Sequence, residues 1–149
     1  MAHLIGSWSE DKSRQIGAVI VGQAKEVRSV GFNGLPRGIS ANVERRHSKD
    51  GGEKYYWFEH AERNAIYNAA RVGIATSGCE IYCTLFPCSD CLRAIVQSGM
   101  HTLKTYAPPE QDAYFQRSFE VSLEMAHEAG LKILAFDPAS LRPAAPSAR

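Results

Sequence analysis

Two short motifs constrain this chain more than any other feature of its sequence. In the first, His60 stands two residues before Glu62, and the second is a Pro-Cys-x-x-Cys stretch over 87–91. Each motif stands where a helix is predicted to begin, one over 61–72 and the other over 88–97. A predicted strand lies between the two helices, so both helix N-termini are expected at the same edge of a sheet.

The rest of the chain predicts alternating strands and helices. Two strands joined by a short hairpin come first, and single strands then alternate with helices to the end of the pattern. The predicted strands cover 16–22, 27–32, 80–85, 102–106 and 132–136, and the predicted helices cover 2–8, 61–72, 88–97 and 113–129. This order favours an α/β protein whose mostly parallel or mixed sheet is covered by helices on both faces.

A chain of 149 residues suits one compact domain, which we expect over 1–137. The stretch 138–149 is rich in Ala, Pro and Ser and is expected to be a flexible tail. The segment 33–56 shows no periodicity and predicts a long surface loop. Its basic cluster has two interpretations, a grip on a phosphate or a solvated surface; the members are Arg45, Arg46, His47 and Lys49.

Charge and cysteine content narrow the class of partner. Lys and Arg number 17 against 16 Asp and Glu, for a formal charge of +1, which argues against a nucleic-acid polymer and favours a small-molecule substrate. No apolar run is long enough to cross a bilayer, and residues 1–10 do not resemble a signal peptide. We therefore expect a cytoplasmic protein that does not enter a membrane, in which the four cysteines are reduced.

His60, Cys88 and Cys91 have the chemistry of a zinc site. Three protein ligands leave a fourth position for water, as a catalytic zinc requires, whereas a structural zinc usually has four protein ligands. Helix starts favour thiolates, because unpaired N–H groups and the helix dipole stabilise negative charge there. Cys79 and Cys83 are interpreted instead as small core residues.

Glu62 is the predicted catalytic residue. It lies close to His60 without being an obvious ligand, so its carboxylate is placed to take a proton from water and pass it to a substrate nitrogen. A zinc ion with an open position lowers the pKa of a bound water to about 7. Together, H-x-E and P-C-x-x-C are the pattern of zinc-dependent nucleobase deaminases.

Over most of its length the chain resembles the cytidine and deoxycytidylate deaminase family, and most closely its dCMP branch. The resemblance is carried by the segments 13–21, 31–38, 60–66 and 85–91. It implies a three-layer α/β/α fold around a mixed five-stranded sheet, and a homo-oligomer. It also implies that His60, Cys88 and Cys91 bind Zn²⁺, that Glu62 moves protons, and that Asn33 and Ala61 bind the substrate. Arg14, just ahead of the first predicted strand, has two interpretations, a substrate-binding contact with a 5′-phosphate or an exposed loop arginine.

The predicted reaction is the hydrolysis of dCMP to dUMP and ammonia, but alternatives stay open. The loop 107–112 is acidic, and the aromatic segment 55–58 either stacks on a base or packs under the loop. Both features leave room for a nucleoside, a free base or another aminated heterocycle as the substrate. A polynucleotide deaminase and a structural zinc or redox-thiol module are the remaining rivals. Asp11 and Lys12 are interpreted as a solvated turn.

Overall fold

The fold is described from a computed structural model, in which residues 1–136 are placed; the predicted tail over 138–149 lies outside the described residues. The five strands are β1 Gly17–Val21, β2 Val27–Phe32, β3 Glu80–Cys83, β4 Thr102–Thr105 and β5 Lys132–Ala135. The helices are α1 Ala2–Gly6, α2 Lys54–Trp57, α3 Ala61–Arg71, α4 Ser89–Gln97 and α5 Gln116–Glu128. Two 3₁₀ turns, η1 Glu44–His47 and η2 Asp50–Gly52, lie between β2 and α2. Among the described residues, no helix is both long and apolar enough to cross a membrane.

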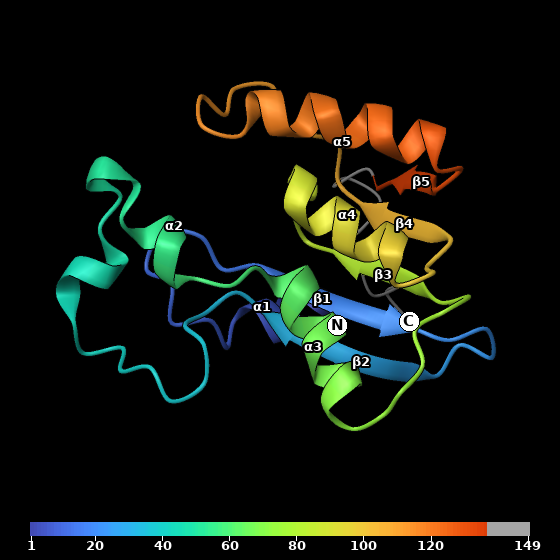
Figure 1. Cartoon of the computed structure of the whole chain (residues 1–149), viewed down its shortest axis with the longest axis horizontal. Helices are drawn as coiled ribbons and strands as arrows, with labels where there is room; N and C mark the ends of the chain where they lie inside the picture. Colours follow the sequence, from blue (N-terminus) through green and yellow to red (C-terminus); the bar gives the residue numbers. More distant parts are fainter. Residues whose placement is uncertain (137–149) are drawn as a thin grey trace, which may run out of the picture.

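The strands form one mixed sheet in the order β2-β1-β3-β4-β5 (Figure 1). Strand β1 is antiparallel to both β2 and β3, whereas β3, β4 and β5 are parallel to one another. The parallel pairs are connected through α4 and α5, as parallel strands require a crossover. The predicted mixed five-stranded sheet is therefore confirmed.

Two glycines show that helices lie on both faces of this sheet. A Cβ on Gly17 would come 2.0 Å from the Ala2 carbonyl oxygen of α1, and a Cβ on Gly31 would come 2.3 Å from the Ala65 amide nitrogen of α3. In the register Gly31 is opposite Ala18, the neighbour of Gly17, so the two glycines point to opposite faces. Helices α1 and α3 thus cover different faces, as the predicted three-layer arrangement requires.

The core lies on the α3 face of the sheet. Side chains from four strands meet the inner sides of α3, α4 and α5 there, and Cys79 and Cys83 are among them as predicted. The fully buried members include Ala18, Ile20, Ala61, Ala65, Ile81, Leu92, Ile95 and Leu103. On the other face, α1 is the one helix in the described part of the chain.

The prediction of a solvated turn at residues 11 and 12 is wrong for Asp11. Lys12 is exposed, as expected, but Asp11 is only 4% exposed. Its carboxylate lies 2.5 Å from the ammonium of Lys54, which is itself buried in α2. The prediction that 33–56 is a surface loop is therefore wrong at the end of that segment. The ion pair buries the start of α2 in the interior.

Helix α5 begins later than the sequence pattern predicts. Asp112 accepts hydrogen bonds from the backbone N–H groups of Tyr114 and Phe115 at 3.2 and 3.0 Å, so these residues form a turn ahead of the helix. The regular helix starts only at Gln116. Apolar spacing alone does not show this turn, because Ala113 and Phe115 continue the periodic pattern.

Candidate metal centre and its cavity

The three predicted metal ligands meet at the starts of α3 and α4. His60 and Cys88 are the N-cap residues of these helices, both with extended backbone, and Cys91 lies in the first turn of α4. The Nδ1 atom of His60 lies 3.4 Å from each of the two sulfur atoms. All three donor atoms fall within 4.8 Å of one another.

The donor set fits zinc. In a tetrahedral site with usual Zn–N and Zn–S bond lengths, a nitrogen and a sulfur ligand stand about 3.5 Å apart. The observed distances of 3.4 Å match that spacing. No fourth His, Cys, Asp or Glu joins the group among residues 1–136, so a metal held here would keep one position for water or substrate.

The surroundings of Cys88 favour the thiolate form that a metal needs. Its hydrogen bond with Cys91 and its contact with His60 outweigh burial and lower the pKa of the Cys88 thiol to about 4. For His60, burial alone would lower the pKa, but the hydrogen bond with Cys88 and the charge of Glu62 raise it overall. These groups therefore stabilise separated charge inside the protein.

Glu62 lies in the first turn of α3, next to the metal ligands, and lines the same cavity as His60 and Cys88. It is 4% exposed, and burial raises its pKa although the charge of His60 opposes the shift. A carboxyl group with a raised pKa can take up and release a proton nearer to neutral pH. Its position thus suits the predicted proton transfer.

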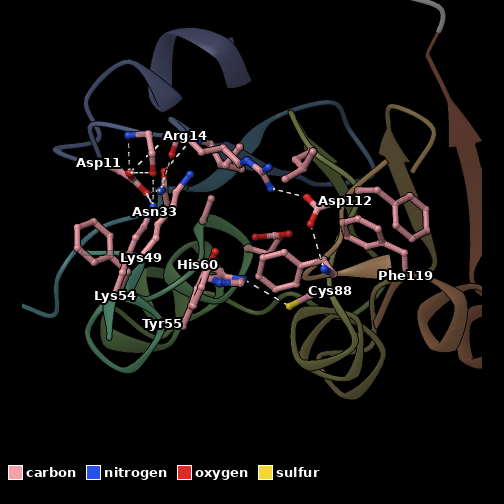
Figure 2. Close-up of a pocket in the computed structure, with 18 residues that line it drawn as sticks. Asp11, Arg14, Asn33, Lys49, Lys54, Tyr55, His60, Cys88, Asp112 and Phe119 are labelled. Carbon is pink, nitrogen blue, oxygen red and sulfur yellow. Dashed lines mark hydrogen bonds and ion pairs between the residues drawn. The ribbon is translucent and has the colours of Figure 1, made fainter. Parts of the chain in front are cut away.

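A cavity opens over this centre (Figure 2). Its walls come from the loop before β1, the end of β2, the segment around α2, the starts of α3 and α4, and the start of α5. The lining residues include all the predicted substrate-binding residues: Arg14, Asn33 and Ala61. Ala61 is fully buried, so it forms part of the wall behind the accessible surface.

Asn33 lies on the cavity wall, and its amide is used by the protein itself. Its Nδ2 donates to Asp11 Oδ2 at 2.9 Å and to the Arg14 carbonyl at 2.8 Å. Its Oδ1 accepts the Ile16 N–H at 2.7 Å. Asn33 therefore holds the loop before β1 in place, and its carbonyl oxygen keeps one further lone pair.

Arg14 is joined to the far wall of the cavity. Its Nη1 donates to Asp112 Oδ2 at 2.9 Å, and the two side chains are 44% and 8% exposed. Burial alone would raise the pKa of Asp112, but the Phe115 N–H and the Arg14 guanidinium lower it overall. The loop after β4 is acidic in sequence. Its buried carboxylate, that of Asp112, is neutralised by Arg14.

The buried pair of Asp11 and Lys54 was not predicted. Lys54 Nζ also donates to Ser13 Oγ at 2.6 Å and stands 5.4 Å from the centre of the Phe58 ring. Hydrogen bonds from Lys54 and Ser13 lower the pKa of Asp11, although burial alone would raise it. The one local signal for this burial is the aromatic segment that follows Lys54 directly.

The basic cluster of the loop divides into two parts. Arg45 pairs with Glu53 at 2.8 Å, Arg46 lies 4.5 Å from the Trp57 ring centre, and His47 bonds the Ala41 carbonyl at 2.8 Å. These three residues stabilise the loop itself. Only the fourth member, Lys49, lines the cavity.

The aromatic segment 55–58 also divides. Tyr55 lines the cavity and stacks on Tyr114, with ring centres 4.2 Å apart, and Phe58 lines it beside Lys54. Trp57 packs under Arg46, whereas Tyr56 is 83% exposed. Both interpretations of the segment thus have support, since part of it lines the cavity and part packs against the loop.

Comparison with known proteins relates the chain to enzymes with similar sequences. Residues 1–107 match the family model described as the cytidine and deoxycytidylate deaminase zinc-binding region. An uncharacterized deaminase from the luxG 3′ region of Aliivibrio fischeri is 40% identical over 136 residues, which cover 89% of this chain and 86% of that protein.

Two further relatives carry more specific names. Human deoxycytidylate deaminase is 36% identical over 103 residues, which cover 67% of this chain but only 57% of the human protein. A crystal structure of dCMP deaminase from the cyanophage S-TIM5, in complex with dCMP and dUMP, superimposes with a TM-score of 0.75. It is 25% identical, and the match covers 91% of this chain and 90% of that one.

Proposed function

Since the chain belongs to the cytidine and deoxycytidylate deaminase family, we propose that it hydrolyses dCMP to dUMP and ammonia. The observation that carries this proposal is the buried carboxyl of Glu62 beside the donor group of His60, Cys88 and Cys91 in one cavity. As a member of this family, the protein is a zinc-dependent hydrolytic deaminase. The monophosphate substrate is supported by the names of the human and cyanophage relatives.

In this proposal four side chains carry out the reaction. His60, Cys88 and Cys91 hold the zinc ion, which when bound supplies a Lewis acid that makes water a nucleophile near neutral pH. Glu62 takes a proton from the attacking water and passes it to the ring nitrogen, and then assists protonation of the leaving amine. The water oxygen becomes bonded to the ring carbon, the exocyclic carbon–nitrogen bond breaks, and ammonia departs.

The remaining residues position the substrate. Arg14 stands at the cavity with a guanidinium suited to a phosphate oxygen. Asn33 fixes the loop that carries Arg14, and its Oδ1 retains one lone pair that can accept a hydrogen bond from a substrate hydroxyl or amine. Ala61, between two of the reacting groups, leaves room for the ring because its side chain is small.

The second candidate is deamination of an unphosphorylated nucleoside, base or related heterocycle. The contact between Arg14 and Asp112 favours it, since a guanidinium already paired with a carboxylate attracts a phosphate less strongly. A polynucleotide substrate has no comparable support, because the formal charge of the chain is only +1.

A substrate panel tests the proposal. Ammonia release by zinc-loaded protein is measured with dCMP, CMP, deoxycytidine, cytosine, adenine and guanine, with Glu62→Ala as the blank. We expect turnover of dCMP above all others. If an unphosphorylated compound is preferred, the protein is a deaminase but dCMP is not its substrate. If none of the compounds releases ammonia, the proposed deamination is wrong.

We propose further that the protein is a cytoplasmic homo-oligomer. None of the four cysteines, all of which lie within residues 1–136, forms a disulfide bond, which suits a reducing compartment. The oligomer rests on the family resemblance. Sedimentation equilibrium checks it, and a mass of one 16.4 kDa chain at micromolar concentration would contradict it.

A further inference from the structure

A second cavity adjoins the cavity over the metal centre. It has a volume of about 560 Å³, and its walls come from η2, the start of α2, and the starts of α3, α4 and α5. Four residues line both cavities: two predicted metal ligands, His60 and Cys88, and two aromatic residues, Tyr55 and Phe115. These side chains therefore stand between the two cavities, and we call Tyr55 and Phe115 the aromatic partition.

The two cavities differ in chemistry and in exposure. Glu62 lines the first cavity but not the second, so the proposed proton transfers take place in the first. The second cavity is lined by Tyr56 and Tyr114, which are 83% and 60% exposed, and it therefore opens to solvent. The aromatic partition thus separates the reacting groups from an open space on this side.

The rings of the partition contact each other and their neighbours. The ring centres of Tyr55 and Phe115 are 5.6 Å apart, with the rings nearly perpendicular at 87°, and Phe115 stands 6.1 Å from the His60 ring. On its other side Tyr55 stacks on Tyr114 at 4.2 Å. Aromatic rings attract one another in such edge-to-face and stacked arrangements. The contacts run without a break from the protein surface to a predicted metal ligand.

Each half of the partition is anchored by one of the two ion pairs of the loop end. Tyr55 directly follows Lys54, whose ammonium lies 2.5 Å from the buried carboxylate of Asp11. The backbone N–H of Phe115 donates to Asp112 Oδ1 at 3.0 Å, and that carboxylate belongs to the second pair. The two rings are therefore fixed from separate parts of the chain.

Resting on the proposed function, we propose that Tyr55 and Phe115 determine specificity by excluding substrates that carry a substituent on the exocyclic amine. The exocyclic nitrogen is bonded to the ring carbon that water attacks, so it lies beside Glu62 and the donor group during the reaction. A substituent on that nitrogen needs space next to His60 and Cys88, and the partition occupies this space. Without either ring, the two cavities join and the substituent enters the second one.

The chemistry itself does not exclude such substrates. With a substituted amine the water oxygen would still become bonded to the ring carbon and the exocyclic carbon–nitrogen bond would break. The substituted amine would leave with the proton in place of ammonia. Selection against the substituent is therefore a matter of space, and it should be relaxed by removing a ring.

Formation of dUMP from two substrates tests the partition. One is dCMP, and the other is dCMP with a propyl group on its exocyclic nitrogen. Since a single excess methylene in a closed pocket changes kcat/KM by roughly 10- to 200-fold, we expect the wild type to prefer dCMP by roughly 100-fold or more. Tyr55→Ala should reduce this preference about tenfold or more, and Phe115→Ala should do the same from the other half.

Tyr55→Phe keeps the ring and should keep the preference of the wild type. A wild-type protein that hydrolyses both substrates equally would overturn the proposal. So would a preference that is unchanged in both alanine variants.

Two neighbours in the same helix supply the controls. Tyr56→Ala removes an exposed tyrosine that lines the second cavity alone of the two, and Trp57→Ala removes a large ring that lines neither. Both variants should keep the preference for dCMP. If Trp57→Ala relaxes it as much as Tyr55→Ala does, loosening of α2 is responsible and the partition is not.

Release of zinc to a chelator separates this inference from the proposed reaction, because it needs no turnover. Zinc-loaded protein is mixed with 4-(2-pyridylazo)resorcinol, whose absorbance reports the extracted metal. Joined cavities give the chelator a second approach to His60 and Cys88, so Tyr55→Ala should release zinc severalfold faster than wild type, Tyr56→Ala and Trp57→Ala.

The two measurements fail independently. If the protein deaminates nothing in the substrate panel but Tyr55→Ala releases zinc faster than both controls, the reaction is wrong and the partition stands. If dCMP is deaminated but Tyr55→Ala releases zinc as slowly as the wild type, the partition does not separate the two cavities and the inference is wrong.

Discussion

The two ends of the cavity are built in different ways. At the metal end, the N-caps and first turns of two helices that pack on the sheet supply His60, Glu62, Cys88 and Cys91. At the loop end, the wall is joined by contacts between segments far apart in the chain, Asp11 with Lys54 and Arg14 with Asp112. Local backbone geometry positions the first group, whereas long-range ion pairs position the second.

This difference assigns the catalytic reaction to the metal end and the selection of the substrate to the loop end. A reaction that needs atoms placed within a fraction of an ångström benefits from helix termini fixed by a packed core. Selection among related substrates depends on loop residues, and these vary more easily without disturbing the core. Changes at the metal end should therefore abolish the reaction, and changes at the loop end should alter stability or substrate preference.

The largest loss of deamination is expected when a predicted metal ligand is replaced. Cys88→Ala removes one of three donors, so the protein should lose stoichiometric zinc and all measurable deamination. Metal content by atomic absorption and ammonia release are measured together. Cys79→Ala, at a buried cysteine outside the donor group, is the control and should keep both. An active Cys88→Ala protein without metal would refute the zinc assignment.

At the loop end the largest effect is expected on stability. Asp11→Asn leaves the ammonium of Lys54 buried without its counter-charge, which should cost about 3 to 5 kcal/mol in the free energy of unfolding. Lys54→Met should cost a similar amount. Because both single changes break the same pair, the double variant should lose less than the sum of the two. Urea denaturation measures all four proteins, and simple additivity would show that the pair is not coupled.

Acid should remove the same stabilisation gradually. The pKa of Asp11 is held below its ordinary value of 3.8, so its ionised form stabilises the fold above that pH. The stabilisation is lost as the pH falls through the lowered pKa. The stability gap between wild type and Asp11→Asn should thus be constant from pH 7 to about 4 and shrink below that.

Measurement of the gap, rather than of either protein alone, removes effects common to both, such as release of metal in acid. Urea denaturation at several pH values from 7 down to 3 provides it. A gap that already closes between pH 7 and 5 would mean that Asp11 is not the group responsible.

The smallest effect is expected from an ion pair on the other face of the sheet. Lys104 lies 2.7 Å from Glu80 there, with both side chains about one sixth exposed at 16% and 17%. Such a pair near the surface contributes about 1 kcal/mol or less. Lys104→Met should therefore reduce stability far less than Asp11→Asn and leave deamination unchanged. If Lys104→Met lowers the free energy of unfolding as much as Asp11→Asn does, the two ion pairs do not differ in their contribution to stability.

The sequence predicted the metal end well because its signals are local. Ligand types, their spacing and helix starts all fall within a few residues, and the structure brings together His60, Cys88 and Cys91 as expected. The alternation of strands and helices likewise predicted the sheet and its layers. Strand ends shifted by a residue or two, as Leu85 and Phe136 show, since ladder pairing and not hydrophobicity decides where a strand stops.

The loop end could not be predicted in the same way. Whether Asp11 is solvated or buried depends on Lys54, which no periodic pattern connects to it. The Asp112 carboxylate looks unfavourable for an anionic substrate until Arg14 is seen beside it. Only the fold brings such partners together, so the sequence predicted the reaction more closely than the selection of its substrate.

The most direct test of the account is the rate of dUMP formation from dCMP by two proteins with equal zinc content, wild type and Glu62→Gln. The amide keeps the size of the side chain but cannot carry a proton between water and substrate. The account predicts one zinc per chain in both proteins and a rate lower by roughly 100- to 10,000-fold in Glu62→Gln. If the zinc-loaded variant keeps most of the wild-type rate, Glu62 does not transfer the proton and the central claim is wrong.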